Sequence, residues 1–182
     1  MNEGLIPRRY AKALYATARE RGVDTKVYDC MNNLERNFAA QPQLQQVMAN
    51  PYVSNDDKIT LLTTASTEGG KEEPTVCDFF RLLAQNKRLD MAYASALAYI
   101  DIYRKEHNIY KVSVVSAAKM DAEEEKRLRS LIEKHLKGGT MEYSSTVDPS
   151  LIGGFTVSVG NERLDASISN ELKQLRLNLL SK

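Results

Sequence analysis

The period of the hydrophobic pattern changes once along this chain, close to residue 108. Before that point apolar residues recur at intervals of three and four, the spacing of one helix face. The first such stripe consists of Ile6, Tyr10, Ala13, Leu14 and Thr17. After that point β-branched residues cluster or alternate with polar ones, which is typical of strands. We therefore expect a mainly α chain: an N-terminal six-helix bundle over residues 1–108, followed by a small α+β C-terminal domain over 109–182.

Helix boundaries in the first part follow from prolines and capping residues. The pair Asn50-Pro51 ends a short helix, because the residue before proline avoids helical geometry. Ser54 begins the next one, since its hydroxyl can cap the free N–H groups and two aspartates follow it. The first three expected helices contain the stripes Ile6–Thr17, Val27–Phe38 and Leu44–Met48. The fourth starts at Ser54 and is followed by a loop at Thr67–Pro74. The fifth runs from Thr75 to about Asn86, and the sixth from Asp90 to about His107.

The second part alternates strands with helices. Asp121, followed by three glutamates, is a capping residue for a helix that Gly138-Gly139 ends. The expected elements are a strand Tyr110–Val115, a helix Asp121–Lys137, strands Met141–Val147 and Phe155–Val159, and a last helix of about Ser167–Leu180.

Charge and cysteine content exclude several classes of protein. The 182 residues carry a net charge of +1. Lys+Arg and Asp+Glu number 14 and 14 up to residue 108, and 11 and 10 after it. Proteins that coat nucleic acid or anionic membranes need a surplus of cations. Two cysteines are too few for a disulfide scaffold or a structural zinc site, and no run of residues approaches a membrane span.

Candidate catalytic motifs do not hold up. Gly69-Gly70-Lys71 lacks the earlier glycine and the following hydroxyl of a phosphate-binding loop. Ser116 and Lys119 match S-x-x-K without its companion motifs. His107 and His135 lie at separate helix ends, where a histidine more often caps the helix or faces solvent than binds a metal. We expect no enzymatic activity, cofactor or metal.

The first and fifth predicted helices have unusually wide apolar arcs. These span roughly 200° and 220°, whereas one core contact requires a stripe of about 100°. Both helices could simply be central in the bundle. Alternatively, part of each arc lines a groove for an amphipathic helix of another protein. In that case Ala13 and Thr17 permit close approach, and Tyr10 and Phe79 supply aromatic anchors.

A series of short motifs resembles one family along nearly the whole chain. In the first part the motifs are Arg9-Tyr10-Ala11-Lys12-Ala13-Leu14 and the run Phe79–Leu89; in the second they are Val114–Ala118, Val147–Phe155 and Asp165–Ile168. In order and spacing they are similar to the delta subunit of bacterial F-type ATP synthase, whose mitochondrial counterpart is the oligomycin-sensitivity-conferring protein.

This resemblance implies a non-catalytic stator subunit that links the catalytic head to the peripheral stalk and resists rotor torque during proton-driven ATP synthesis. It implies that the bundle's groove, at Tyr10, Ala13 and Leu82, receives the N-terminal helix of an alpha subunit. The helix wheel adds Thr17 and Phe79. The C-terminal domain would bind the C-terminal region of the b-subunit stalk through Ile152–Phe155, that is Ile152, Gly153, Gly154 and Phe155, and through the last helix. The protein would sit peripherally at the cytoplasmic face of the inner (plasma) membrane, as part of the complex.

A helical RNA-binding module resembling antitermination factors is the alternative. Its predicted sign is a basic stripe and a steep salt dependence of binding, and the 14 to 14 charge balance counts against it.

Overall fold

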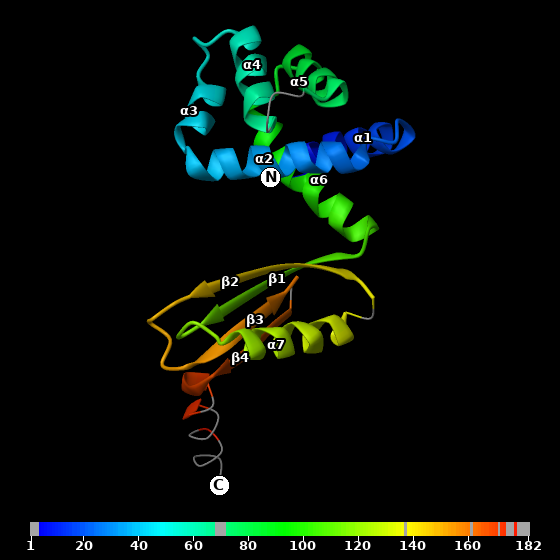
Figure 1. Cartoon of the computed structure of the whole chain (residues 1–182). Helices are drawn as coiled ribbons and strands as arrows, with labels where there is room; N and C mark the ends of the chain where they lie inside the picture. The colour runs from blue at the N-terminus through cyan, green and yellow to red at the C-terminus, as the bar shows by residue number, and fades with distance from the viewer. Residues whose placement is uncertain are drawn as a thin grey trace. The chain divides into compact units, whose positions relative to one another are not determined.

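The computed structural model describes residues 4–67, 72–136, 138–160, 162–170, 172–173 and 177. Its contacts divide the chain into two compact units, Met1–Arg104 and Lys105–Lys182. The division falls in the last turn of a helix, close to the point where the hydrophobic period changes. Figure 1 shows a helical first unit and a second unit built on a sheet.

The regular elements among the described residues of the first unit are all helices. Its elements are α1 (Leu5–Glu20), α2 (Asp24–Ala40), α3 (Gln43–Ala49), α4 (Asn55–Ser66), α5 (Pro74–Gln85), the 3-10 helix η1 (Leu89–Met91) and α6 (Ala92–Glu106). The stripes predicted for α2 and α3 become the buried faces of these helices. In α1 the buried face is offset from the predicted stripe, of which only Leu14 is buried. Met31, Leu34, Phe80 and Tyr99 are completely buried. Ser54 caps α4 as predicted, its Oγ accepting the Asp57 N–H at 3.1 Å.

The predicted sixth helix is divided in the structure. Residues 89–91 form η1, and the α-helix begins only at Ala92. Eight helices thus have defined bounds within the described residues, seven α and one 3-10, counting α7 of the second unit. A mainly helical chain with a sheet in its second unit is confirmed, but "six-helix bundle" is an incomplete description of its helices.

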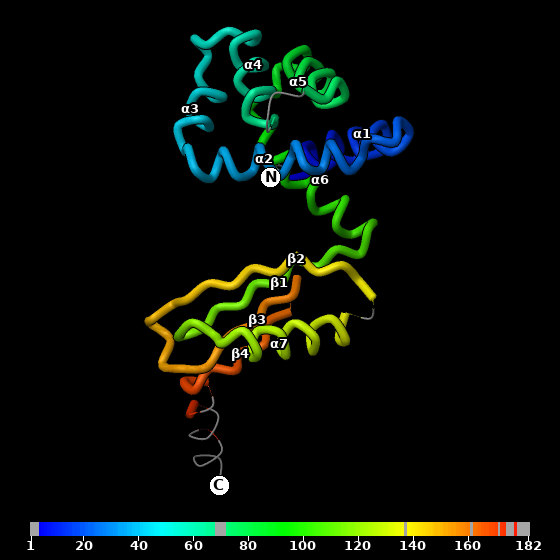
Figure 2. Tube along the Cα trace, viewed as in Figure 1, coloured from blue at the N-terminus to red at the C-terminus, as the bar shows by residue number. Residues whose placement is uncertain are grey.

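The second unit is a four-stranded sheet with one helix across it. Its elements are β1 (Ile109–Ser116), α7 (Ala122–His135), β2 (Thr140–Val147), β3 (Gly154–Val159) and β4 (Glu162–Ser167), in the spatial order β2-β1-β3-β4. β1 and β2 are parallel, with Val112 opposite Tyr143, and α7 forms their crossover. β3 is antiparallel to both β1 and β4. Figure 2 follows this path along the trace.

The core of this unit lies between the sheet and α7. It contains Val112, Val114 and Val157 from the sheet and Ile132 and Leu136 from the helix end. Strand β4 was not predicted. The end of the predicted last helix, including Leu175 and Leu179, lies outside the described residues, which place helix at 168–170, 172–173 and 177.

Candidate functional site

Helices α1 and α5 enclose a groove on the first unit. All five residues predicted for a helix-binding groove line one hollow of about 140 Å³: Tyr10, Ala13, Thr17, Phe79 and Leu82. Leu14, Arg21, Thr75 and Asp78 complete its lining. We call this hollow the α1/α5 groove. The structure therefore brings together residues that are separated by about 60 positions in the chain, as the two wide apolar arcs suggested.

The groove has a buried floor and exposed walls. Phe79 is only 5% exposed, and its ring lies 5.9 Å from that of Phe80. Leu82 is 43% exposed, while Ala13 is exposed and Tyr10 and Thr17 are half-buried. Phe79 was expected as an aromatic anchor, but its own unit already covers it, so it forms the floor. Exposed apolar surface for a partner comes from Tyr10, Ala13 and Leu82.

Charged groups close one end of the groove. Arg21 of the α1 C-terminus donates from Nη1 to Thr75 Oγ1 at 3.2 Å, and the same nitrogen lies 3.6 Å from Asp78 Oδ2. Arg81 also reaches Asp78, with 3.3 Å between Nη1 and Oδ1. Because Arg21 ends α1 and Thr75 begins α5, the two helices run antiparallel across the groove.

Arg88 marks the opposite end. Its guanidinium carbon lies 5.9 Å from the centre of the Tyr10 ring. The backbone turn after α5 holds it there: Lys87 has a φ of 55°, and Arg88 donates its N–H to Leu83 O at 2.8 Å, the bond of a Schellman turn. Neither Arg21 nor Arg88 was predicted as a groove residue. Only the position of Arg21, four residues after Thr17 on the same helix face, offered a local signal.

A second hollow lies on the C-terminal unit, with a volume of about 520 Å³. The connection from β1 to α7, one side of α7 and the loop before β3 line it. Its residues are Ser116, Ala117, Ala118, Lys119, Met120, Glu124, Arg127, Leu128, Leu131, Gly153, Gly154 and Phe155. Three of the four residues predicted for stalk binding are among them. Ile152 is not, but its side chain is 71% exposed.

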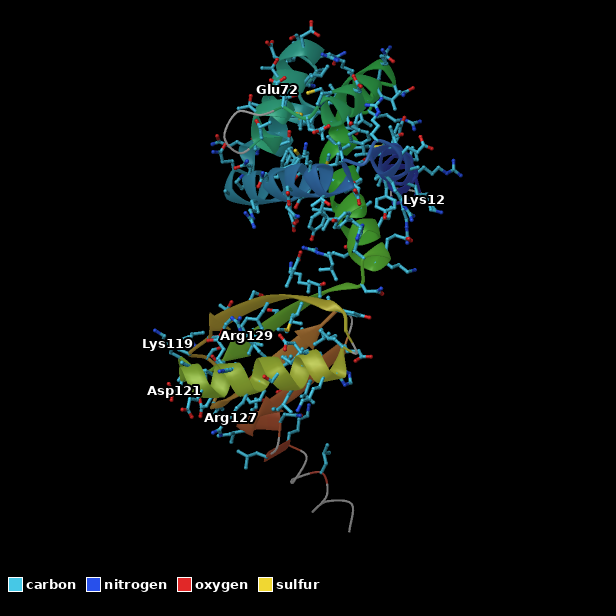
Figure 3. The ribbon with its side chains drawn as sticks, turned by 45° about the vertical axis from the view of Figure 1, so that its right-hand side comes forward. Lys12, Glu72, Lys119, Asp121, Arg127 and Arg129 are labelled. Carbon is cyan, nitrogen blue, oxygen red and sulfur yellow. The ribbon has the colours of Figure 1, made fainter. Side chains whose placement is uncertain are left out.

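The glycine pair shapes this hollow. Gly153 and Gly154 have φ values of 93° and 79°, which favour glycine. A Cβ atom on Gly154 would collide with the carbonyl oxygen of Ala166 on β4. The apolar part of the wall comes from α7, where Leu131 is exposed. Figure 3 labels Lys119 just before this helix and Arg127 on it. The contribution of α7 was not predicted, because only the cap and the end of this helix were read from the sequence.

The thiols lie in the interior of the first unit. Cys30 and Cys77 are both free and buried. Burial, reinforced by the carboxylates of Glu73 and Asp29, raises the pKa of Cys30 to about 11. A thiol with such a pKa is protonated and inert at neutral pH. No group of three or more His, Cys, Asp or Glu side chains suited to a metal ion occurs in the described part of the chain.

Known proteins resemble this chain over its full length. The sequence model of the family described as ATP synthase delta (OSCP) subunit matches residues 6–179. The chain belongs to the ATP synthase delta (OSCP) subunit family. It is 35% identical to ATP synthase subunit delta of Bacteroides thetaiotaomicron, covering 100% of this chain and 97% of the relative. It is 38% identical to the subunit of the same name from Parabacteroides distasonis, over 99% and 98% of the two chains.

The fold is shared with a more distant solved structure. A chain in the cryo-EM structure of the Toxoplasma gondii mitochondrial ATP synthase hexamer superposes with a TM-score of 0.74 at 23% identity, over 96% of this chain and 97% of the other. As a delta/OSCP family member, the chain is a structural subunit of the ATP synthase complex and not a catalytic one. No helix within the described ranges is both long and apolar enough to cross a bilayer.

Proposed function

We propose that this subunit is a stator connector, whose two units bind the catalytic head and the peripheral stalk of the synthase. The first unit, with its six α-helices acting as one module, takes the N-terminal helix of an alpha subunit. The second unit takes the C-terminal region of the b-subunit stalk. A connector of this kind prevents the head from turning with the rotor. The subunit would lie at the cytoplasmic face of the membrane as a peripheral part of the complex.

The α1/α5 groove is the observation that carries this proposal. Its floor, Phe79, is packed by its own unit, while Leu82 and Ala13 leave apolar surface exposed along both walls. An amphipathic helix lays its apolar face into such a groove and gains most of its affinity from a few desolvated anchors. Binding of that kind resists torque through buried apolar surface and shape complementarity, and it requires no catalytic step.

The second hollow supports the stalk contact. Gly153, Gly154 and Phe155 line it together with Leu128 and Leu131 of α7, and the exposed Ile152 directly precedes Gly153. Ile168 extends this surface, since its Cδ1 lies close to Gly153. A second apolar site on a separate unit is what a connector requires.

Calorimetry with a synthetic peptide of the alpha subunit's N-terminal segment, from the same organism, tests the head contact. We expect Tyr10→Asp and Leu82→Asp each to weaken binding at least about tenfold, because a charge would have to be desolvated against apolar surface. Tyr52→Asp is the matched control: this tyrosine is 95% exposed and lies between α3 and α4, away from the groove. Unchanged affinity in both groove variants, with circular dichroism intact, would refute the proposal.

A further inference from the structure

The rim of the α1/α5 groove is more basic than the unit that carries it. Three guanidinium groups stand at its two ends, Arg88 at one and Arg21 and Arg81 at the other. One carboxylate, Asp78, is shared by the latter two. Among the described residues no carboxylate lies within ion-pair distance of Arg88. Arg88 is therefore uncompensated by any ion pair within this part of the chain. Arg21 and Arg81, in contrast, share Asp78, and the Glu73 carboxylate accepts from Thr75 Oγ1, beside Arg21, at 3.3 Å.

The solvent face of α1 adds to this excess. Arg8, Arg9, Lys12 and Arg19 are all exposed, and Glu20 is the single acidic residue of the helix. Figure 3 shows Lys12 pointing outward from α1. Since residues 1–108 carry 14 cationic and 14 acidic side chains, this local excess means that acidic groups gather on other surfaces of the unit. The equal numbers of cationic and acidic side chains in the unit thus hide a basic excess around α1 and the groove.

We infer that the helix bound in the α1/α5 groove carries carboxylates at two places about three turns apart, one facing Arg88 and one facing Arg21 and Arg81. This inference rests on the proposed helix-in-groove function and specifies the chemistry of the partner. Tyr10, under Arg88, and Arg21 are separated by three helical turns along α1, a span of roughly 16 Å at 1.5 Å per residue. Acidic side chains so placed fix the register of a helix that an apolar groove alone would allow to slide.

Neutralising one end at a time tests the inference on the full chain. With the alpha N-terminal peptide as probe, we expect Arg81→Gln and Arg88→Gln each to weaken binding about threefold, and both together about tenfold. Arg36→Gln removes an equal charge from an exposed position on α2 and should leave the affinity unchanged. The wild-type affinity should fall when salt rises from about 50 to about 500 mM, and the double variant should lose most of this dependence.

Peptide variants complete the test without altering the protein. Glu or Asp to Gln at each end of the peptide should weaken binding to wild type but not to the variant that lacks the facing arginine. Peptide binding that is indifferent to salt and to both arginines would overturn the inference while leaving the groove itself intact. Failure of the wild-type chain to bind the peptide at all would instead refute the proposed function. Salt-dependent binding of a hairpin RNA, lost in the same arginine variants, would overturn the inference in favour of a nucleic-acid surface.

Discussion

Lys58 links two helices of the first unit through one buried ammonium group. Its side chain on α4 is 7% exposed, and Nζ donates to Met48 O at 2.9 Å and Asn50 O at 2.7 Å. These carbonyls lie at the C-terminal end of α3, where a cation is favourable. With seven residues, α3 is too short to be stable alone. Lys58 therefore fixes the end of a helix that needs tertiary support.

Replacing Lys58 by Met keeps the apolar stem and removes the donor. We expect Lys58→Met to lower the free energy of unfolding by about 2–3 kcal/mol, because carbonyl oxygens are left without partners. Urea denaturation measures it. Lys26→Met, at an exposed position on α2, is the control and should change stability by less than about 0.5 kcal/mol. Equal effects of the two substitutions would show that the buried contact is unimportant.

Cys30 makes stability depend on alkaline pH. Burial raises the pKa of its thiol to about 11, whereas an unfolded cysteine titrates near about 8.5. Between these values the unfolded state binds fewer protons, so the free energy of unfolding falls as pH rises. We expect wild type to lose more stability than Cys30→Ala between about pH 8 and about pH 10. The variant subtracts the contribution of other titrating groups, and parallel losses in both proteins would contradict the assignment.

At the scale of elements, a capping box starts α7. The Asp121 carboxylate accepts the Ala122 N–H at 2.7 Å, and Glu124 Oε2 accepts the Asp121 N–H at 3.3 Å. Asp121→Ala should destabilise the helix by about 1 kcal/mol and speed hydrogen exchange of the first-turn amides. Glu123→Ala, which removes an exposed first-turn carboxylate paired with Arg127 at 3.6 Å, is the control. Unaltered exchange in Asp121→Ala would contradict the cap's role.

Elements whose pattern is local could be predicted from the sequence. The helices of the first unit follow from stripes at intervals of three and four, and their starts from residues such as Ser54 and Asp121. Strand β4 could not be predicted, because Glu162–Ser167 is an edge strand with mostly exposed, charged residues. Its pairing with β3, which places Leu164 opposite Val157, is tertiary. The break between η1 and α6 was also missed, since Asp90 looks like an ordinary helix start.

The same distinction applies to the candidate site. The five predicted groove residues line one hollow. The family resemblance implied Tyr10, Ala13 and Leu82, and the wide apolar arcs, which are a local signal, added Thr17 and Phe79. Arg88 could not be found, because a turn with positive φ at Lys87 carries it back over Tyr10, and that contact joins residues far apart in the chain. Phe79 was predicted as an aromatic anchor for the partner, but its own unit buries it. This burial depends on the residues that pack behind α5, which a helix pattern does not reveal.

At the scale of the whole molecule, each unit has its own core. The first unit buries Tyr99 and Ile100 of α6 completely, so it needs that helix to fold. We expect residues 1–108 to fold alone and to bind the alpha peptide as the full chain does. A fragment ending at Asn86 should lose its helicity, as measured by circular dichroism. Loss of binding or helicity in the 1–108 fragment would contradict independent folding.

The central claim is that one chain holds two partners at once. Its most direct test is capture of a soluble C-terminal fragment of the b subunit on immobilised alpha N-terminal peptide. We predict that the b fragment is retained only when the full chain is present. It should be lost with Tyr10→Asp, and also with residues 1–108 alone. Retention of the b fragment by the 1–108 fragment, or release of the chain from the alpha peptide when b binds, would contradict the connector role.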